Sequence, residues 1–143
     1  YINSTMALHE AINKGADEAL LLDKNGFISE GSGENIFLIK DNIISSPLTD
    51  HCLNGITRQS VIQIAADLGY QMIEKDLTYD DLLSSDEAFF TGTAVEITPI
   101  SKIDENQIGI GSRGPITEKL QTTYNDIIYG QNDLYKHWLS LVT

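Results

Sequence analysis

Two short turn signals in the first third of the chain constrain its fold more than any other feature. The first is Asn25-Gly26 and the second is Asp41-Asn42, and each lies between two short apolar segments. Asn, Asp and Gly tolerate the positive φ angles that two-residue hairpin turns require. The sequence therefore predicts two successive β-hairpins. Their strands are expected at residues 18–23 and 27–31 and at residues 35–41 and 43–46.

Helices are predicted where apolar residues recur at helical spacing and the segment ends at a helix-stopping residue. The expected helices cover residues 4–14, 57–68, a short stretch at 80–84 and a long segment that starts at Pro115. Further strands are expected at residues 71–77, 87–91, 95–103 and 107–111. The tail that contains Leu134, Trp138 and Leu141 is expected to pack back onto the body. We therefore expect one mixed α/β (α+β) domain over residues 1–143.

The charge balance excludes some classes of partner. The chain carries 9 basic and 21 acidic residues, a net charge of −12, whereas nucleic acids and anionic membranes attract basic surfaces. A small anionic ligand is compatible with this charge, because backbone amides bind phosphate. No apolar run approaches the roughly 18 residues of a membrane span, and no signal peptide is visible. The single cysteine, Cys52, suits a reducing compartment, so a cytoplasmic location is expected.

Residues 109–114 (GIGSRG) match the G-x-G-x-x-G pattern of dinucleotide-binding folds. Those folds require a further strand after the helix and an acidic residue about 20 positions on. Only 13 residues follow Gly130, and they show no apolar strand pattern. We therefore interpret the segment as a glycine-rich connection.

Two other segments have the chemistry of an anion-binding site. A helix begins in residues 53–58 (LNGITR), where Asn54 or Thr57 is expected to cap it and Gly55 permits close approach to its positive end. A turn in residues 90–99 (FTGTAVEITP) offers two hydroxyl groups and several free backbone amides. Each segment also has a plainer interpretation, a capped helix for the first and a tight turn for the second.

The two glutamates of residues 28–38 (ISEGSGENIFL) raise a different question. Glu30 lies at the end of an expected buried strand, where an unpaired carboxylate is costly. The plainer interpretations are a partly exposed strand end for Glu30 and a capping or ion-pairing role for Glu34. The histidines lack metal-ligand spacing, no nucleophile motif is present, and nothing specifies carbohydrate binding by a glycosidase pair. Together, the three segments favour a ligand with an anionic end and a protonated ring or amine.

The ordered set ISEGSGENIF, LNGITR and FFTGTAVEITPI resembles the fold-type IV aminotransferases, which use pyridoxal 5'-phosphate, and among them the branched-chain amino-acid aminotransferases. The resemblance continues through GPITEKLQTTYNDIIYG and HWL near the C-terminal end. It covers the whole chain but only the C-terminal half of such an enzyme. It implies the C-terminal domain of that fold, a twisted mixed sheet or pseudo-barrel of hairpins with flanking helices. It also implies that the N-terminal domain is missing from this chain.

The resemblance implies roles around the cofactor ring for three residues. Glu30 would face the pyridine nitrogen and keep it protonated, and the resulting cation would let Glu30 stay ionised. Tyr1 would contact the phenolic oxygen of the cofactor. Leu53 would pack against one face of the ring.

The resemblance also implies two sets of anion contacts. Ile56 and Thr57 would donate backbone amides to the cofactor phosphate, and Thr57 would add its hydroxyl. Thr93 would contact the phosphate from another side. The amides of Thr93 and Ala94 would receive the carboxylate of the substrate.

The Schiff-base lysine of the family precedes the position that Tyr1 matches. No lysine of this chain is therefore expected to be catalytic, and the chain alone is expected to be inactive. The whole enzyme is expected to be a homodimer or higher oligomer that interconverts branched-chain L-amino acids and 2-oxo acids, with 2-oxoglutarate and glutamate as partners. The alternatives are a D-amino-acid aminotransferase, an aminodeoxychorismate lyase or a non-catalytic stand-alone binding domain. No metal, nucleic acid or membrane is expected as a partner.

Overall fold

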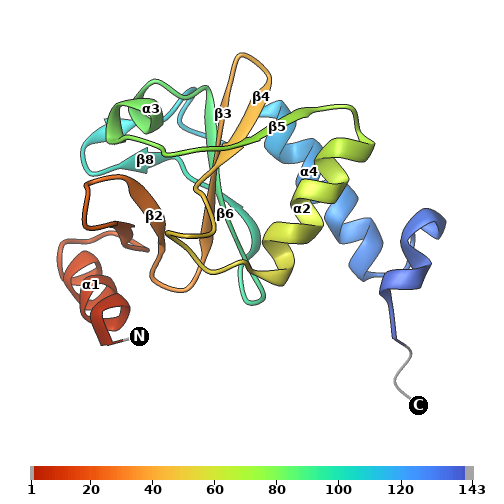
Figure 1. Ribbon diagram of the computed structural model, residues 1–143, viewed down its shortest axis with the longest axis horizontal. Coiled ribbons are helices and arrows are strands. Elements are labelled where there is room, and N and C mark those ends of the chain that lie inside the picture. The colour runs from red at the N-terminus through yellow and green to blue at the C-terminus, as the bar shows by residue number, and fades with distance from the viewer. Residues whose placement is uncertain (1, 141–143) are drawn as a thin grey trace.

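A mixed five-stranded sheet forms the centre of the computed structural model, which describes residues 2–140 (Figure 1). The strand order is β5-β4-β3-β6-β7, in which β4 and β5 are parallel and the other neighbours are antiparallel. The strands are β3 (Asn35–Lys40), β4 (Ile43–Ser46), β5 (Gln71–Glu74), β6 (Glu87–Gly92) and β7 (Glu96–Pro99). The sheet and the helices around it confirm the predicted fold class, a mixed α/β (α+β) domain.

Both predicted hairpins are confirmed. Asp41 and Asn42 adopt φ angles of 50° and 62° in the turn that joins β3 to β4, which is the conformation their side chains tolerate. The first hairpin pairs β1 (Leu20–Leu22) with β2 (Ile28–Gly31) in a separate two-stranded sheet. Turn chemistry alone therefore predicted the local topology of the first third of the chain.

Side chains of the central strands alternate between two hydrophobic cores. Phe37 and Ile39 of β3 enter one core with Phe89 of β6, and the rings of Phe37 and Phe89 stack with centroids 5.0 Å apart. Ile36 and Leu38 of β3 enter the other core. Because both faces of β3 are covered, its apolar run is continuous rather than alternating.

The helices lie on different sides of this sheet (Figure 1). They are α1 (Ile2–Asn13), α2 (Ile56–Asp67), α3 (Tyr79–Leu83) and α4 (Pro115–Ile128). Helices α2 and α4 contribute Val61, Ile64 and Leu120 to the core that contains Phe37. Helix α1 lies beside the β1–β2 hairpin and contains no buried residue. All four expected helices are confirmed, with ends that shift by one or two residues.

The strand expected at residues 95–103 is divided in the structure. It stops at the end of β7, and β8 (Lys102–Ile103) then pairs with β9 (Asn106–Gln107) in a small separate sheet. The chain reverses at Asp104, which has a φ angle of 48°. The apolar pattern predicted strand residues here but not the turn that redirects them.

Two other expected strands are shorter than predicted. The strand expected at residues 71–77 ends at Glu74. The strand expected at residues 107–111 is wrong beyond Gln107, because Gly109 follows with a φ angle of 49° that a β-strand does not accommodate.

The tail forms the 3₁₀ helix η1 (Asp133–Trp138), which contacts α4. The prediction that the tail packs onto the body is confirmed, but Leu134 is 81% exposed and takes no part in this packing. Tyr135 is the buried residue, with its ring edge-on to Trp138 and its hydroxyl donating to the carboxylate of Asp67. Burial and the neighbouring Asp67 carboxylate raise the pKa of Tyr135 to about 12. Leu141 lies outside the described residues.

Among residues 2–140, no helix has both the length and the apolar character needed to cross a membrane.

Candidate functional site

Three segments that are far apart in the sequence, together with Ser4 of α1, line a cavity of about 460 Å³. These segments are the turn after β2, the start of α2 and the end of β6. Five residues that were predicted to contact a ligand line this cavity: Glu30, Leu53, Ile56, Thr57 and Thr93. The three motifs singled out in the sequence therefore meet in one place.

Two other residues, Ala94 and Tyr1, were also predicted to contact a ligand. Ala94 is exposed in the turn after β6 and does not line the cavity. Tyr1 lies outside the described residues. The ligand contacts assigned to all seven residues stay predictions.

Helix α2 begins at the cavity without a side-chain cap. Its N-cap residue is Gly55, with φ −64° and ψ 151°, so the prediction that Asn54 or Thr57 caps the helix is wrong. The Asn54 side chain instead accepts a hydrogen bond from Nη1 of Arg58 at 3.2 Å. Thr57 is only 4% exposed in the first turn. The first N–H groups of α2 therefore remain available at the positive end of the helix.

Glu30 is half-buried at the end of β2, on the same cavity as the start of α2. Its Oε2 accepts a hydrogen bond from the backbone N–H of Leu53 at 2.9 Å. An ionised carboxylate has acceptor capacity beyond one such bond. Glu30 is thus held in place by the protein and can still accept from a ligand.

Glu34 gives the cavity a second carboxyl group. Burial and the nearby Glu18 carboxylate raise the pKa of Glu34 to about 7. Among the described residues, Glu34 forms no salt bridge and no side-chain cap, so neither of the plainer predictions for it is borne out. Near neutral pH this group is therefore partly protonated, in contrast to an ordinary glutamate.

Two buried polar residues of the cavity wall were not predicted as site residues. Asn35 is 5% exposed and its Nδ2 donates to the carbonyl of Leu53 at 2.7 Å. Thr91 is 1% exposed and lies opposite Asn35 in the β3–β6 ladder, and its Oγ1 has no hydrogen-bond partner among residues 2–140. Buried polar atoms normally have a partner. A polar residue at the end of an apolar strand was the available signal, but many such residues are only structural.

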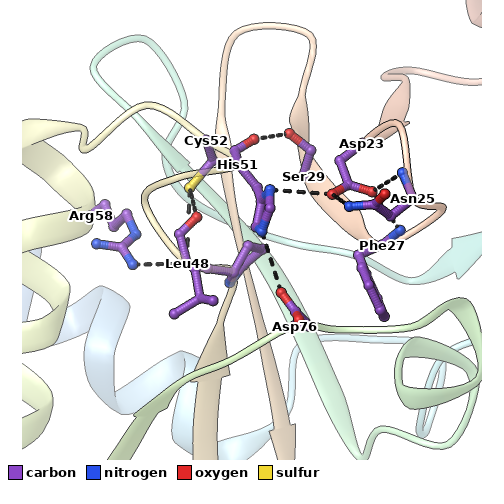
Figure 2. A network of polar contacts seen from close by, with 10 residues as sticks. Asp23, Asn25, Phe27, Ser29, Leu48, His51, Cys52, Arg58 and Asp76 are labelled. Carbon is purple, nitrogen blue, oxygen red and sulfur yellow. Dashed lines mark hydrogen bonds and ion pairs between the residues drawn. The ribbon is translucent and has the colours of Figure 1, made fainter.

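A polar network supports the loop of residues 47–55, which leads into α2 (Figure 2). His51 lies between two carboxylates, with Nδ1 3.2 Å from Asp23 and Nε2 3.4 Å from Asp76. The hydroxyl of Ser29 donates to the carbonyl of His51. The loop is thereby tied to both the β1–β2 hairpin and the segment after β5.

The Asp23 end of this network is built by the hairpin turn itself (Figure 2). Its Oδ1 accepts from the N–H groups of Phe27 and Asn25 at 2.9 and 2.8 Å. Burial raises the pKa of Asp23, but these hydrogen bonds and His51 outweigh it and hold the pKa below its usual value. Asp23 therefore stays ionised beside His51 at neutral pH.

Nucleophilic and metal chemistry have no support at this loop. The Sγ of Cys52 lies 3.5 Å from the carbonyl of Leu48, and burial raises the pKa of the Cys52 thiol (Figure 2). A thiol that stays protonated is a poor nucleophile. Within residues 2–140, no group of three or more His, Cys, Asp or Glu side chains could hold a metal ion.

The G-x-G-x-x-G segment precedes α4. The N-terminus of α4 is already occupied by a carboxylate of the chain itself. The carboxylate of Glu87, which is 8% exposed, accepts from the N–H groups of Ile116 and Thr117 at 3.1 and 2.8 Å. A side chain at Gly114 would collide with Glu87. In the described part of the chain no strand follows α4, so the interpretation as a glycine-rich connection is confirmed.

The cavity thus combines an uncapped helix N-terminus, a fixed carboxylate and the start of the turn after β6. A helix N-terminus binds phosphate or carboxylate, and an ionised carboxylate binds a protonated nitrogen. Such an arrangement has the chemistry to bind a ligand that carries both an anionic group and a cation. It is the kind of site in which a phosphorylated cofactor with a protonated ring is held.

The sequence matches the class IV amino-transferase family over residues 1–103, and the chain belongs to that family.

Known relatives share the whole length of the chain. The branched-chain-amino-acid aminotransferase of Pseudomonas aeruginosa is 53% identical over 142 residues, which are 99% of this chain and 46% of that protein. The crystal structure of the T.th. branched-chain amino acid aminotransferase with pyridoxamine 5'-phosphate superimposes with a TM-score of 0.98 at 47% identity. The structure of the same enzyme complexed with N-(5'-phosphopyridoxyl)-L-glutamate gives the same TM-score and identity. Both alignments cover 100% of this chain and 48% of the enzyme, so the chain spans about half the length of these relatives.

Proposed function

We propose that this chain is the cofactor-holding part of a pyridoxal 5'-phosphate-dependent aminotransferase that interconverts branched-chain L-amino acids and 2-oxo acids. The observation that carries the proposal is the cavity of about 460 Å³, on which both the uncapped start of α2 and the carboxylate of Glu30 lie. The relatives named above support branched-chain substrates over a D-amino-acid aminotransferase or a lyase. The complex of one of them with phosphopyridoxyl-glutamate supports glutamate and 2-oxoglutarate as the second pair.

The residues of the cavity fit such a cofactor at its phosphate end. Ile56 and Thr57 would donate their backbone N–H groups from the first turn of α2, and the buried Thr57 would add its hydroxyl. Thr93, which lines the same cavity at the turn after β6, would contribute a further contact. The unpartnered Oγ1 of the buried Thr91 supports a polar ligand in this space.

The ring end of the cofactor would meet Glu30 and Leu53. When bound, pyridoxal phosphate supplies the electron sink on which amino-group transfer depends. Glu30 would hold the proton on the ring nitrogen, since its carboxylate is already oriented by the N–H of Leu53. The side chain of Leu53, which is 68% exposed, would cover one face of the ring. The contact of Tyr1 with the phenolic oxygen stays a prediction.

The substrate carboxylate would be received by the turn after β6. Thr93 lines the cavity and Ala94 follows it in the same exposed turn. Successive backbone N–H groups of a turn form a concave anion site. Ala94 does not line the cavity, so the contact of its N–H group with the substrate stays a prediction.

The activity and assembly of the whole protein belong to the same proposal. The Schiff-base lysine and a further domain would come from the part of the protein that this chain does not contain. A homodimer or higher oligomer and a cytoplasmic location stay predictions.

The substitution Glu30→Gln in the full-length protein tests the proposal. Gln cannot keep the ring nitrogen protonated, so kcat should fall by the equivalent of about 2–3 kcal/mol while cofactor binding falls less. The measurements are steady-state kinetics and a cofactor titration followed by absorbance. Glu105→Gln, at an exposed glutamate in the β8–β9 turn, is the matched control and should leave both unchanged. Unchanged turnover in Glu30→Gln would refute the role of Glu30, and a wild-type protein that binds no cofactor would refute the proposed function.

A further inference from the structure

The backbone of Leu53 is fixed from two sides immediately before α2. Its N–H donates to Glu30 at 2.9 Å, and its carbonyl accepts from Nδ2 of Asn35 at 2.7 Å. The same carbonyl also accepts from the N–H of Gly55 at 3.0 Å, which makes residues 53–55 a tight three-residue turn. The side chains of Glu30 and Asn35 therefore fix the position of this turn and, with it, the position of the first residue of α2.

Asn35 is itself held rigidly. It begins β3, pairs with Thr91 in the sheet and is 5% exposed. A side chain that is buried at a strand end and hydrogen-bonded has few alternative rotamers. Its position is thus determined by the sheet rather than by the loop.

Gly55 is required by Asn35 and not by its own backbone conformation. Its φ of −64° and ψ of 151° are accessible to any residue. A Cβ atom at this position would lie 2.5 Å from Oδ1 of Asn35, and the nearest atom of any other described residue beyond its two chain neighbours is Cβ of Arg58, at 3.9 Å. Among the described residues beyond the two chain neighbours, the close obstacle to a side chain at position 55 is therefore Asn35.

We propose that Asn35 is a positioning residue that fixes the start of α2 for phosphate binding, with Gly55 as its steric partner. The proposal rests on the proposed function, because it assigns Asn35 to the phosphate end of the same site. The side chain of Asn35 holds the carbonyl of Leu53 by a hydrogen bond. Because Gly55 has no Cβ atom, the helix can begin close to Asn35. Asn35 acts through the loop and needs no contact with the cofactor.

A double-mutant cycle in the full-length protein tests this pairing. The variants are Asn35→Ala, Gly55→Ala and the double variant, and the readouts are the pyridoxal phosphate dissociation constant by absorbance titration and the melting temperature without cofactor. Asn35→Ala should raise the dissociation constant roughly fivefold, since one buried hydrogen bond that orients the loop is lost. Gly55→Ala should raise it about tenfold in the wild-type background and less than twofold when Asn35 is already Ala, because contacting residues couple.

Two further variants separate sterics from hydrogen bonding. Asn35→Asp keeps the volume but loses the Nδ2 donor, so it should weaken cofactor binding and should not relieve the effect of Gly55→Ala. Gly33→Ala is the control glycine, because an added Cβ there meets no atom within 4 Å. Its effect should simply add to that of Asn35→Ala. If Gly55→Ala alone does not fold, folding of the double variant is the rescue that the proposal requires.

The outcomes are distinct. Equal effects of Gly55→Ala in both backgrounds would overturn the proposal. A lowered melting temperature of Asn35→Ala with an unchanged dissociation constant would also overturn it, since Asn35 would then be only structural. A wild-type protein that binds no pyridoxal phosphate would overturn the proposed function and the ligand role of Asn35 together.

Discussion

Helices α2 and α4 begin in nearly the same way but face different surroundings. Each starts after an extended glycine that offers no capping side chain, Gly55 for α2 and Gly114 for α4, and each has Ile-Thr in its first turn. In front of α4, the buried carboxylate of Glu87 accepts from the N–H groups of Ile116 and Thr117. In front of α2 lies the cavity.

The difference shows that a helix N-terminus becomes a binding site only where the tertiary structure leaves it unfilled. The literal G-x-G-x-x-G pattern precedes α4, so motif matching alone selects the helix whose positive end is already neutralised. The electrostatic preference is the same at both helices. At α4 it is satisfied internally and stabilises the fold, and at α2 it remains available to a ligand.

The largest expected effect concerns the filled end. Glu87→Gln replaces an acceptor pair by an amide that can satisfy only part of the first turn of α4. The free energy of unfolding should fall by about 2–3 kcal/mol, because a buried charge-assisted capping interaction is lost. Urea denaturation measures this loss. Glu118 lies on α4 and forms an exposed ion pair with Arg113, which precedes the helix. Glu118→Gln should change the free energy of unfolding by less than about 1 kcal/mol. Equal stability of the two variants would contradict the role of Glu87.

A matched pair of threonines separates the two helix ends by ligand binding. Thr57→Val removes the hydroxyl that we place at the cofactor phosphate and should raise the dissociation constant of pyridoxal phosphate about tenfold. Thr117→Val removes a buried hydroxyl from the first turn of α4, and this hydroxyl has no hydrogen-bond partner in the described part of the chain. This control should leave the dissociation constant unchanged. The measurement is an absorbance titration of the full-length protein, and equal affinities of the two variants would contradict the assignment of the phosphate to α2.

The smallest expected effect concerns Glu34, which lines the cavity and forms no salt bridge among the described residues. Its pKa in the folded state is raised to about 7, so the folded state keeps its proton over a pH range in which the unfolded state, with the ordinary pKa of 4.5, is already ionised. Stability is therefore lost as pH rises from about 4.5, and the loss is complete once pH passes about 7. Glu34→Gln removes this loss. Its gain in stability should grow from pH 5 to pH 8 and reach about 1 kcal/mol, after allowance for partial solvent exposure.

Urea denaturation at the two pH values measures this difference. Glu105→Gln, at an exposed glutamate of the β8–β9 turn, is the control and should show no growth of the difference with pH. A stability difference between wild type and Glu34→Gln that does not change with pH would contradict the raised pKa.

Elements with a local chemical signal were predicted well. The Asp41-Asn42 turn specified its hairpin, and Pro115 specified the start of α4, because the governing preference lies within a few residues of chain. The end of the strand expected at residues 95–103 was missed, because the apolar pattern continues across Pro99 and the break depends on a separate pairing of β8 with β9. In the tail, Leu134 was expected to pack but Tyr135 is the buried residue, since a 3₁₀ helix orients side chains differently from an α-helix.

The sequence by itself determined the hairpins, the helices and the set of motifs for which we predict a ligand with an anionic and a cationic group. These follow from backbone preferences, apolar spacing and the cost of an unpaired carboxylate, which act locally. Only the tertiary structure decided which helix N-terminus stays open, because that depends on where Glu87 of β6 lies relative to α4. Only the tertiary structure brought Asn35 against Gly55, since contacts between residues 20 positions apart depend on how the sheet and the loop pack together.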